Sequence, residues 1–154
     1  MAATAEARLK ELGIELPAPA APAANYVPFV HMEKLLFVSG QLPLIAGGPA
    51  YNGKLGKDYS VEDGQSAARA CAINILAQAK AALGDLERIK RCVRLNGFVN
   101  AVPEFTDHPE VINGASNLIA DALGDRGRHS RIAVGCGSLP RNVPVEVDAV
   151  FITD

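Results

Sequence analysis

The polar residues with the clearest chemical potential lie in an otherwise apolar C-terminal stretch, RIAVGCGSLPRNVPVEVDAVF, at residues 131–151. Alternation along a strand places Arg131 on the same face as the small residue Ala133. A guanidinium beside small residues is suited to bidentate capture of a carboxylate or phosphate. The following strand carries Glu146 and Asp148 on a common face. The pattern leaves two alternatives, an anion-binding site at Arg131 or a structural ion pair between Arg131 and one of these acids.

The three cysteines and three histidines do not form a recognisable site. Cys71, Cys92 and Cys136 are far apart and include no C-x-x-C pair, which argues against a disulfide scaffold. Cys71 belongs to a helical apolar stripe and Cys136 to an apolar strand, so we expect both side chains to pack in the fold. The histidines lack ligand spacing, and the sequence predicts no metal site; they are His31, His108 and His129.

Two long helical patterns accompany these strands. Ser60 and Asp63 resemble a capping box at the start of the first helix, and Gly84 is a suitable end. Apolar residues between them recur at three- and four-residue spacing, which is typical of a helix that covers a sheet. We expect Asp107 to cap the second helix and Gly124 to end it.

Strands account for most of the other apolar segments. The chain divides into residues 1–23, with a helix and a Pro/Ala-rich linker, and a domain at residues 24–154. The helix is expected at Ala5–Leu12 and the linker at Pro17–Ala23. Strands are expected at Tyr26–Val30, Lys34–Ser39, Ile89–Val102, Arg131–Cys136 and Val145–Ile152, with a sheet extension at Leu42–Ile45.

The order of these elements predicts the α+β class. We expect a two-layer sandwich in which two helices cover one face of a mixed sheet of about six strands. The strands carry apolar residues on both faces, because neighbouring residues such as Phe37 and Val38, or Phe98 and Val99, are both apolar. A second apolar face has to be covered, most simply by another copy of the chain. The sequence therefore predicts an oligomer.

The overall composition is that of one ordinary domain. The 154 residues are 49% hydrophobic and 21% charged, with a formal net charge of −2. No long basic run is present, and the short basic group at residues 88–94 is more typical of a strand edge than of an RNA-binding patch. The N-terminus lacks the apolar core of a signal peptide, and no stretch is long enough to span a membrane. The cytoplasm is therefore the expected location.

The C-terminal motif resembles the signature of the RidA/YjgF family, the reactive-intermediate deaminases that are also called L-PSP endoribonucleases. The family pattern has an arginine that opens a strand, a Leu-Pro turn, and a glutamate in the next strand. Here these are Arg131, Leu139-Pro140 and Glu146, at the family's spacing. The likeness covers about residues 24–152 and is more specific than any single motif.

Upstream segments extend this resemblance and imply further site residues. YVPFV is similar to an early family segment that begins with a tyrosine, here Tyr26, and FVSGQLP is similar to the family's Ser-Gly-Gln strand end, with Ser39 and Gly40. Asn113 falls where the family has a helix asparagine near its cleft. Ala133 stands where the family's deaminases often have a cysteine. The resemblance implies that these residues line a substrate-binding cleft.

The family likeness also implies an assembly and a reaction. It implies a chorismate-mutase-like fold and a homotrimer whose sheets pack around a threefold axis, with clefts between subunits. Arg131 would bind the carboxylate of a 2-imino or 2-enamino acid, Glu146 would position or activate water, and no cofactor is implied. An imine carbon is already electrophilic, so its hydrolysis needs an oriented water and a route for protons.

Departures from the family pattern keep three functions open. Ala133 replaces the usual cysteine, and His129-Ser130 replaces a Pro-Ala pair. The first function is a hydrolytic deaminase that releases ammonia and a 2-oxo acid. The second is a non-catalytic protein on the same fold that binds a small carboxylate and acts as a sensor or regulatory partner. The third and least favoured is an endoribonuclease.

Overall fold

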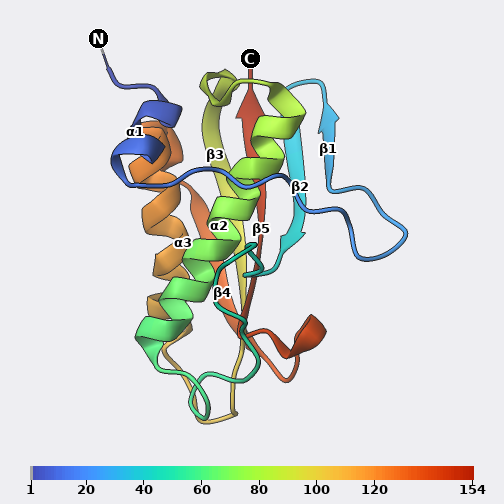
Figure 1. Ribbon diagram of the computed structural model, residues 1–154, viewed down its shortest axis with the longest axis vertical. Helices are drawn as coiled ribbons and strands as arrows, with labels where there is room; N and C mark the ends of the chain where they lie inside the picture. Colours follow the sequence, from blue (N-terminus) through green and yellow to red (C-terminus); the bar gives the residue numbers. More distant parts are fainter. Residues whose placement is uncertain (1) are drawn as a thin grey trace.

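Within residues 2–154, which the computed structural model describes, the chain forms helices packed on a five-stranded sheet (Figure 1). The α-helices are α1 (Ala5–Glu11), α2 (Val61–Leu83) and α3 (His108–Leu123). The strands are β1 (Phe29–Met32), β2 (Leu35–Gln41), β3 (Ile89–Asn100), β4 (Ser130–Cys136) and β5 (Val145–Thr153). Short 3-10 turns are η1 (Leu86–Arg88), η2 (Gly124–Gly127) and η3 (Pro140–Asn142). Helices α2 and α3 cover one face of the sheet, which confirms the predicted two-layer α+β fold.

The register of the sheet fixes which residues share a face. The strand order is β1-β2-β5-β3-β4; β3 pairs with β4 in parallel, and the other neighbouring strands pair antiparallel. Leu95 of β3 lies beside Arg131 of β4 and beside Ala149 of β5. Phe98 of β3 lies beside Glu146 of β5. Because side chains alternate along a strand, the row through Leu95 and the row through Phe98 lie on opposite faces.

The local signals at the helix ends had mixed outcomes. The capping box at α2 is confirmed, because Ser60 and Asp63 each accept a hydrogen bond from the other's backbone N–H. Gly84 ends α2 with a left-handed φ of 78°, a conformation that glycine adopts without steric cost. The expected cap at Asp107 is wrong. This residue precedes α3, but its backbone (φ −89°, ψ 36°) is not extended and its side chain makes no capping bond.

Within residues 2–154 the sheet has five strands and not the six that the sequence predicts. Residues 42–45 add no strand, because the side chain of Asn74 on α2 donates to the carbonyls of Leu42 and Leu44 at 2.8 and 3.0 Å. A side-chain amide thus takes the place of a neighbouring strand. The first strand also begins at Phe29, three residues later than predicted.

The two faces of the sheet differ sharply in burial. The helix-covered face holds the core, in which α2 and α3 pack fully buried side chains against the strands; these include Leu36, Ile75, Leu95, Ile112, Leu118 and Phe151. The opposite face, which we call the open face, presents large apolar side chains that are 39–67% exposed: Val30, Met32, Leu35, Phe37, Ile132 and Ile152. The predicted second apolar face is therefore present.

The N-terminal segment is fastened to the helical layer. Ala5 and Leu9 of α1 are buried, and the backbone N–H of Ala5 donates to Glu87 Oε1 at 2.7 Å. The linker crosses over α2 (Figure 1), where Gln78 donates to the carbonyl of Ala20 at 2.8 Å. Helix α1 and the linker therefore cover part of the outer surface of the helices.

Candidate functional site

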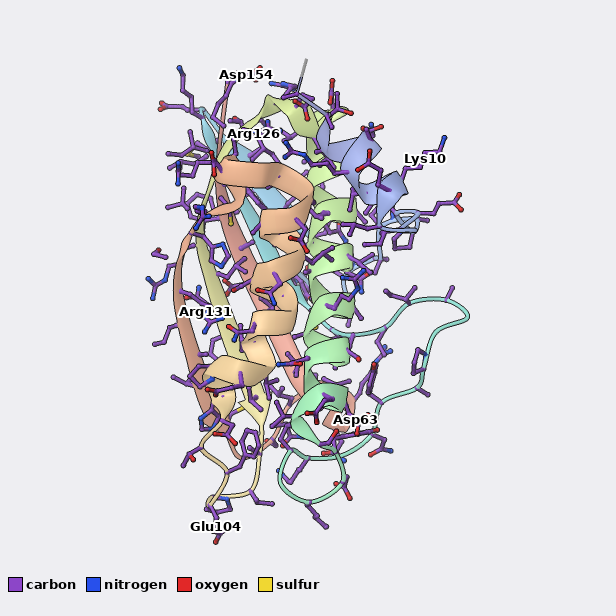
Figure 2. All side chains as sticks on the ribbon, turned by 90° about the vertical axis from the view of Figure 1, so that its left-hand side faces the viewer. Lys10, Asp63, Glu104, Arg126, Arg131 and Asp154 are labelled. Atoms are coloured by element: carbon purple, nitrogen blue, oxygen red, sulfur yellow. The ribbon has the colours of Figure 1, made fainter. Side chains whose placement is uncertain are left out.

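Arg131 lies near the start of the edge strand β4, and three acceptors from α3 hold its guanidinium. Its Nη1 donates to Asn113 Oδ1 at 2.8 Å and to Ser116 Oγ at 3.1 Å, and its Nη2 donates to the carbonyl of Pro109 at 3.3 Å. Figure 2 shows Arg131 at the side of the molecule where β4 and α3 meet. Because several bonds to one helix restrain a planar group, the orientation of the guanidinium is fixed.

The guanidinium keeps donors for a ligand. It has five N–H groups, and the bonds to α3 use three of them. Among residues 2–154, no hydrogen bond uses Arg131 Nε. The Nε–H and the second Nη2–H belong to adjacent nitrogen atoms, an arrangement that can bind both oxygens of a carboxylate. The side chain is partly exposed, so an anion can reach these donors.

Two residues of α3 and one of β4 complete the surroundings of Arg131. Asn113 and Ser116 are three residues apart and therefore share one side of the helix. The resemblance predicted Asn113, and the structure brings it to Arg131. Sequence reasoning missed Ser116, for which the three-residue spacing from Asn113 was the available signal. Ala133 lies on the same sheet face as Arg131, beside Gly97, and packs partly against the core.

Glu146 lies on the open face, in a hollow of about 280 Å³. Burial raises the pKa of Glu146, and the neighbouring carboxylate of Asp148 raises it further. A carboxyl group with a raised pKa beside an open hollow is suited to proton transfer. The residues that line the hollow come mainly from the strands: Gly40, Phe98, Cys136, Leu139, Glu146 and Asp148.

Of the other predicted residues, Gly40 lies beside Glu146, and Ser39 and Tyr26 lie near Gly40 in the chain or in the fold. A Cβ atom built at Gly40 would overlap Glu146 Oε1, so the absence of a side chain lets the carboxylate approach the β2 backbone. Ser39 Oγ donates to the carbonyl of Val27 at 2.8 Å and fastens the segment before β1 to β2. Tyr26 is 48% exposed and, with Gly40, lines an adjoining hollow of about 140 Å³.

The structure thus divides the predicted site into two parts on opposite faces of the sheet. The arginine half-site contains Arg131, Asn113 and Ser116, and the glutamate half-site contains Glu146 and Gly40. One chain does not bring the two half-sites together. The predicted alternative of an ion pair between Arg131 and either strand acid is wrong, because Arg131 bonds to α3 and both acids are on the open face.

The short basic group at residues 88–94 makes local contacts. Arg88 pairs with Asp154 at 2.9 Å, and its Nη1 donates to the carbonyl of Leu83 at 3.2 Å. Arg94 Nε donates to Asn96 Oδ1 at 2.9 Å. Both arginines therefore make structural contacts, and the predicted strand edge is wrong, because β3 pairs with β5 on one side and with β4 on the other.

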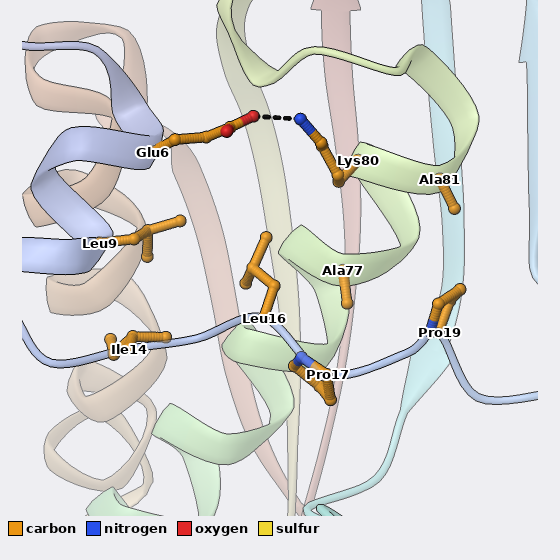
Figure 3. Close-up of a pocket in the computed structure, with 9 residues that line it drawn as sticks. All are labelled: Glu6, Leu9, Ile14, Leu16, Pro17, Pro19, Ala77, Lys80 and Ala81. Carbon is orange, nitrogen blue, oxygen red and sulfur yellow. Dashed lines mark hydrogen bonds and ion pairs between the residues drawn. The ribbon is translucent and has the colours of Figure 1, made fainter.

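A larger hollow, of about 380 Å³, lies between α1, the linker and α2 (Figure 3). Glu6 and Lys80 form an ion pair at its rim. The remaining lining is apolar: Leu9, Ile14, Leu16, Pro17, Pro19, Ala77 and Ala81. Neither half-site contributes a residue to this hollow.

Within residues 2–154, no group of three or more His, Cys, Asp and Glu side chains is placed to hold a metal ion. None of the helices in this range has the length and apolar character that a membrane crossing requires.

The fold and the C-terminal signature agree with a comparison against known families. Residues 6–150 match the family described as "YjgF/chorismate mutase-like, putative endoribonuclease". The chain belongs to this family. The resemblance predicted from the motifs, and the fold that it implied, are therefore confirmed.

Individual relatives are similar along nearly the whole chain. Protein TCP17 from Trypanosoma cruzi is 53% identical over 145 residues, which cover 94% of this chain and 91% of the relative. The structure of protein Atu1372 from Agrobacterium tumefaciens, described as having unknown function, has 56% identity and a TM-score of 0.91, and the match covers 97% of this chain and 92% of that one. A structure described as a "putative endoribonuclease" from Shewanella oneidensis has 39% identity and a TM-score of 0.94, with coverage of 97% and 99%.

Proposed function

We propose that the protein is a hydrolytic deaminase of small 2-imino or 2-enamino acids. The observation that carries this proposal is the geometry of Arg131. Helix α3 fixes its guanidinium, while Nε–H and one Nη2–H remain for a carboxylate. The family resemblance of Arg131, Asn113 and Glu146 supplies the substrate class and the reaction.

A homotrimer with clefts between subunits would unite the two half-sites. Arg131 and Glu146 of one chain lie on opposite faces of the sheet and do not serve one substrate. In the proposed trimer, the open face of one subunit packs beside the β4 edge of the next. Arg131 of one subunit then faces Glu146 of its neighbour. Burial of the apolar open face would supply the driving force for assembly.

The proposed reaction needs an oriented water and a group that moves protons. Arg131 binds the substrate carboxylate and places the imine carbon near Glu146. Ionised Glu146 accepts a proton from water as the water oxygen attacks that carbon, and the imine nitrogen takes up a proton from solvent to give a carbinolamine. Glu146 then returns its proton to the amino nitrogen as the carbon–nitrogen bond breaks. The hydroxyl oxygen loses its proton to solvent as the carbonyl forms, so that ammonia and a 2-oxo acid are released. The raised pKa of Glu146 supports both steps.

Ammonia release from 2-aminoacrylate, generated in place by a dehydratase, tests the proposal. We expect the wild-type protein to exceed the spontaneous rate, and Arg131→Ala and Glu146→Gln to return to it. Arg128→Ala is a matched control, because Arg128 is exposed and its ion pair with Asp125, at 3.5 Å, lies on the surface. Wild-type rates equal to the spontaneous rate for several imino acids would reject deamination.

A second candidate is a non-catalytic protein that binds small carboxylates through the same arginine. Ala133 favours it, because the family's deaminases often have a cysteine at this position. Thermal stabilisation by 2-oxo acids that is lost in Arg131→Ala, without ammonia release, would support this candidate. RNA cleavage that persists through purification and disappears in Glu146→Gln would instead support the activity in the family's description.

A further inference from the structure

His129 and Ser116 form a hydrogen-bonded pair behind Arg131. Ser116 Oγ lies 2.8 Å from His129 Nε2 and 3.1 Å from Arg131 Nη1. His129 Nδ1 lies 2.6 Å from the carbonyl oxygen of Gly127. One chain of hydrogen bonds therefore runs from turn η2 through His129, the residue before β4, to Ser116 of helix α3. It ends at the guanidinium of Arg131.

The chemistry of the partners fixes the direction of this chain. A carbonyl oxygen only accepts, so His129 Nδ1 carries a proton. In the neutral imidazole, Nε2 is then an acceptor and receives a hydrogen bond from the Ser116 hydroxyl. The lone pairs of the Ser116 oxygen are left for the N–H of Arg131. The pair therefore presents an acceptor to the guanidinium in one defined orientation.

We propose that His129 and Ser116 are positioning residues that hold Arg131 for carboxylate binding. The inference rests on the proposed function, in which Arg131 is the anchor. Without an acceptor at residue 129, the Ser116 hydroxyl can turn toward the carbonyl of Ile112, one helical turn earlier. Arg131 Nη1 would then keep a well-oriented acceptor only at Asn113. The guanidinium would sample more orientations, and the fork formed by Nε and Nη2 would be less well prepared for a ligand.

The protonation state of His129 controls the direction of the Ser116 bond. Burial lowers the pKa of His129 below the ordinary value of 6.5, and the charge of Arg131 lowers it further, against the opposing effect of the Gly127 carbonyl. Neutral pH therefore favours the accepting form. Acidification places a proton on Nε2, removes the acceptor for Ser116, and sets an imidazolium beside a guanidinium.

The other groups around His129 are neutral or belong to the surface. Helix α3 presents the neutral side chains of Asn113 and Ser116. In η2, Asp125 forms an exposed ion pair with Arg128. From β3, Arg91 donates to the carbonyl of Arg128 at 3.0 Å. Arg131 is the charge that acts on His129 most directly.

Calorimetric titration with pyruvate tests the positioning role. Ser116→Ala removes the acceptor and should weaken binding about tenfold, because one hydrogen bond to a charged group is lost. Ser116→Thr keeps the hydroxyl and should bind like the wild type. His31→Asn is the control histidine substitution. His31 contacts Thr153 and lies on β1, at the edge of the sheet opposite β4. Equal affinities for the wild type and Ser116→Ala would overturn the inference.

The pH profile separates positioning from simple electrostatics. Pyruvate affinity of the wild type should fall as pH drops below 6.5, and His129→Phe should bind weakly at every pH without this step. A histidine that acted only as a nearby charge would strengthen anion binding on protonation. Stronger binding at low pH, or an unchanged profile in His129→Phe, would therefore contradict the proposal.

Nitrogen-15 spectra of the histidine rings report the tautomer of His129 without any ligand. We expect the Nδ1–H form of His129 at neutral pH and a changed Nε2 signal in Ser116→Ala. The Nε2–H form would refute the hydrogen-bond chain directly. A wild type that binds no carboxylate would reject the proposed function and, with it, the role of the pair. Binding that the variants do not alter would reject the positioning role alone.

Discussion

Arg131 on β4 and Glu146 on β5 point to opposite faces of one sheet, although the resemblance assigns both to one reaction. The register shows the separation directly, because Arg131 stands beside Leu95 of β3 and Glu146 beside Phe98. Leu95 and Phe98 are three residues apart and therefore face opposite ways. Each chain consequently carries both parts of the predicted site on separate faces, and only the proposed trimer would bring them together.

Subunit complementation tests this arrangement. Arg131→Ala and Glu146→Gln should each be inactive alone, yet their co-expression should restore part of the activity. A cleft that takes Arg131 from one variant chain and Glu146 from the other is intact, and in random trimers this holds for about a quarter of the clefts. Ammonia release from purified mixed trimers measures the effect. Mixed trimers without activity would show that the two residues do not meet across an interface.

The open face should mediate the assembly. Phe37→Lys places a charge among apolar side chains that the proposed trimer buries, so we expect dissociation to monomers at micromolar concentration. Leu12→Lys is the matched control, because Leu12 is 39% exposed on the N-terminal segment and Phe37 is 45% exposed on the open face. Light scattering coupled to size exclusion reports the mass. A monomeric wild type, or a Phe37→Lys protein that keeps the wild-type mass, would contradict this role.

Glu146→Gln should stabilise the protein at neutral pH while it removes activity. Burial and Asp148 raise the pKa of Glu146 above its ordinary value of 4.5. The folded state then binds a proton more readily than the unfolded state, so this residue's contribution to stability falls as pH rises through the interval above 4.5. The melting temperature of Glu146→Gln should exceed that of the wild type at pH 7, and the difference should vanish below pH 4.5. The exposed Glu104→Gln is the control, and equal melting temperatures across the range would refute the expectation.

Local sequence signals predicted local structure well. The capping box at Ser60 and the glycine end at Gly84 depend on neighbouring residues alone, and both were recognised. The alternation within β4 and within β5 was also correct. Residues 42–45 were misassigned because their carbonyls are satisfied by Asn74, which lies about thirty positions away in the chain and could not be paired with them by pattern.

The separation of Arg131 from Glu146 could not be read from the sequence, for a physical reason. Strands β4 and β5 are not neighbours, since β3 lies between them. Their relative faces depend on two registers, and a slip of one residue in either would place both side chains on the same face. The Ser116–His129 contact depends in the same way on the path of η2, which no periodicity specifies.

Gly40→Ala should damage the glutamate half-site through contact with Glu146. A Cβ atom at this position overlaps Glu146 Oε1, so the carboxylate has to turn away from the β2 backbone. A misplaced group that should orient water lowers the reaction rate strongly, so we expect kcat/KM to fall about tenfold or more. Gly137→Ala is the matched control, because nothing lies within 4 Å of a Cβ atom built there. Steady-state ammonia release and circular dichroism together distinguish a displaced carboxylate from a misfolded chain, and a Gly40→Ala protein with wild-type kcat/KM would show that the close approach has no role in the reaction.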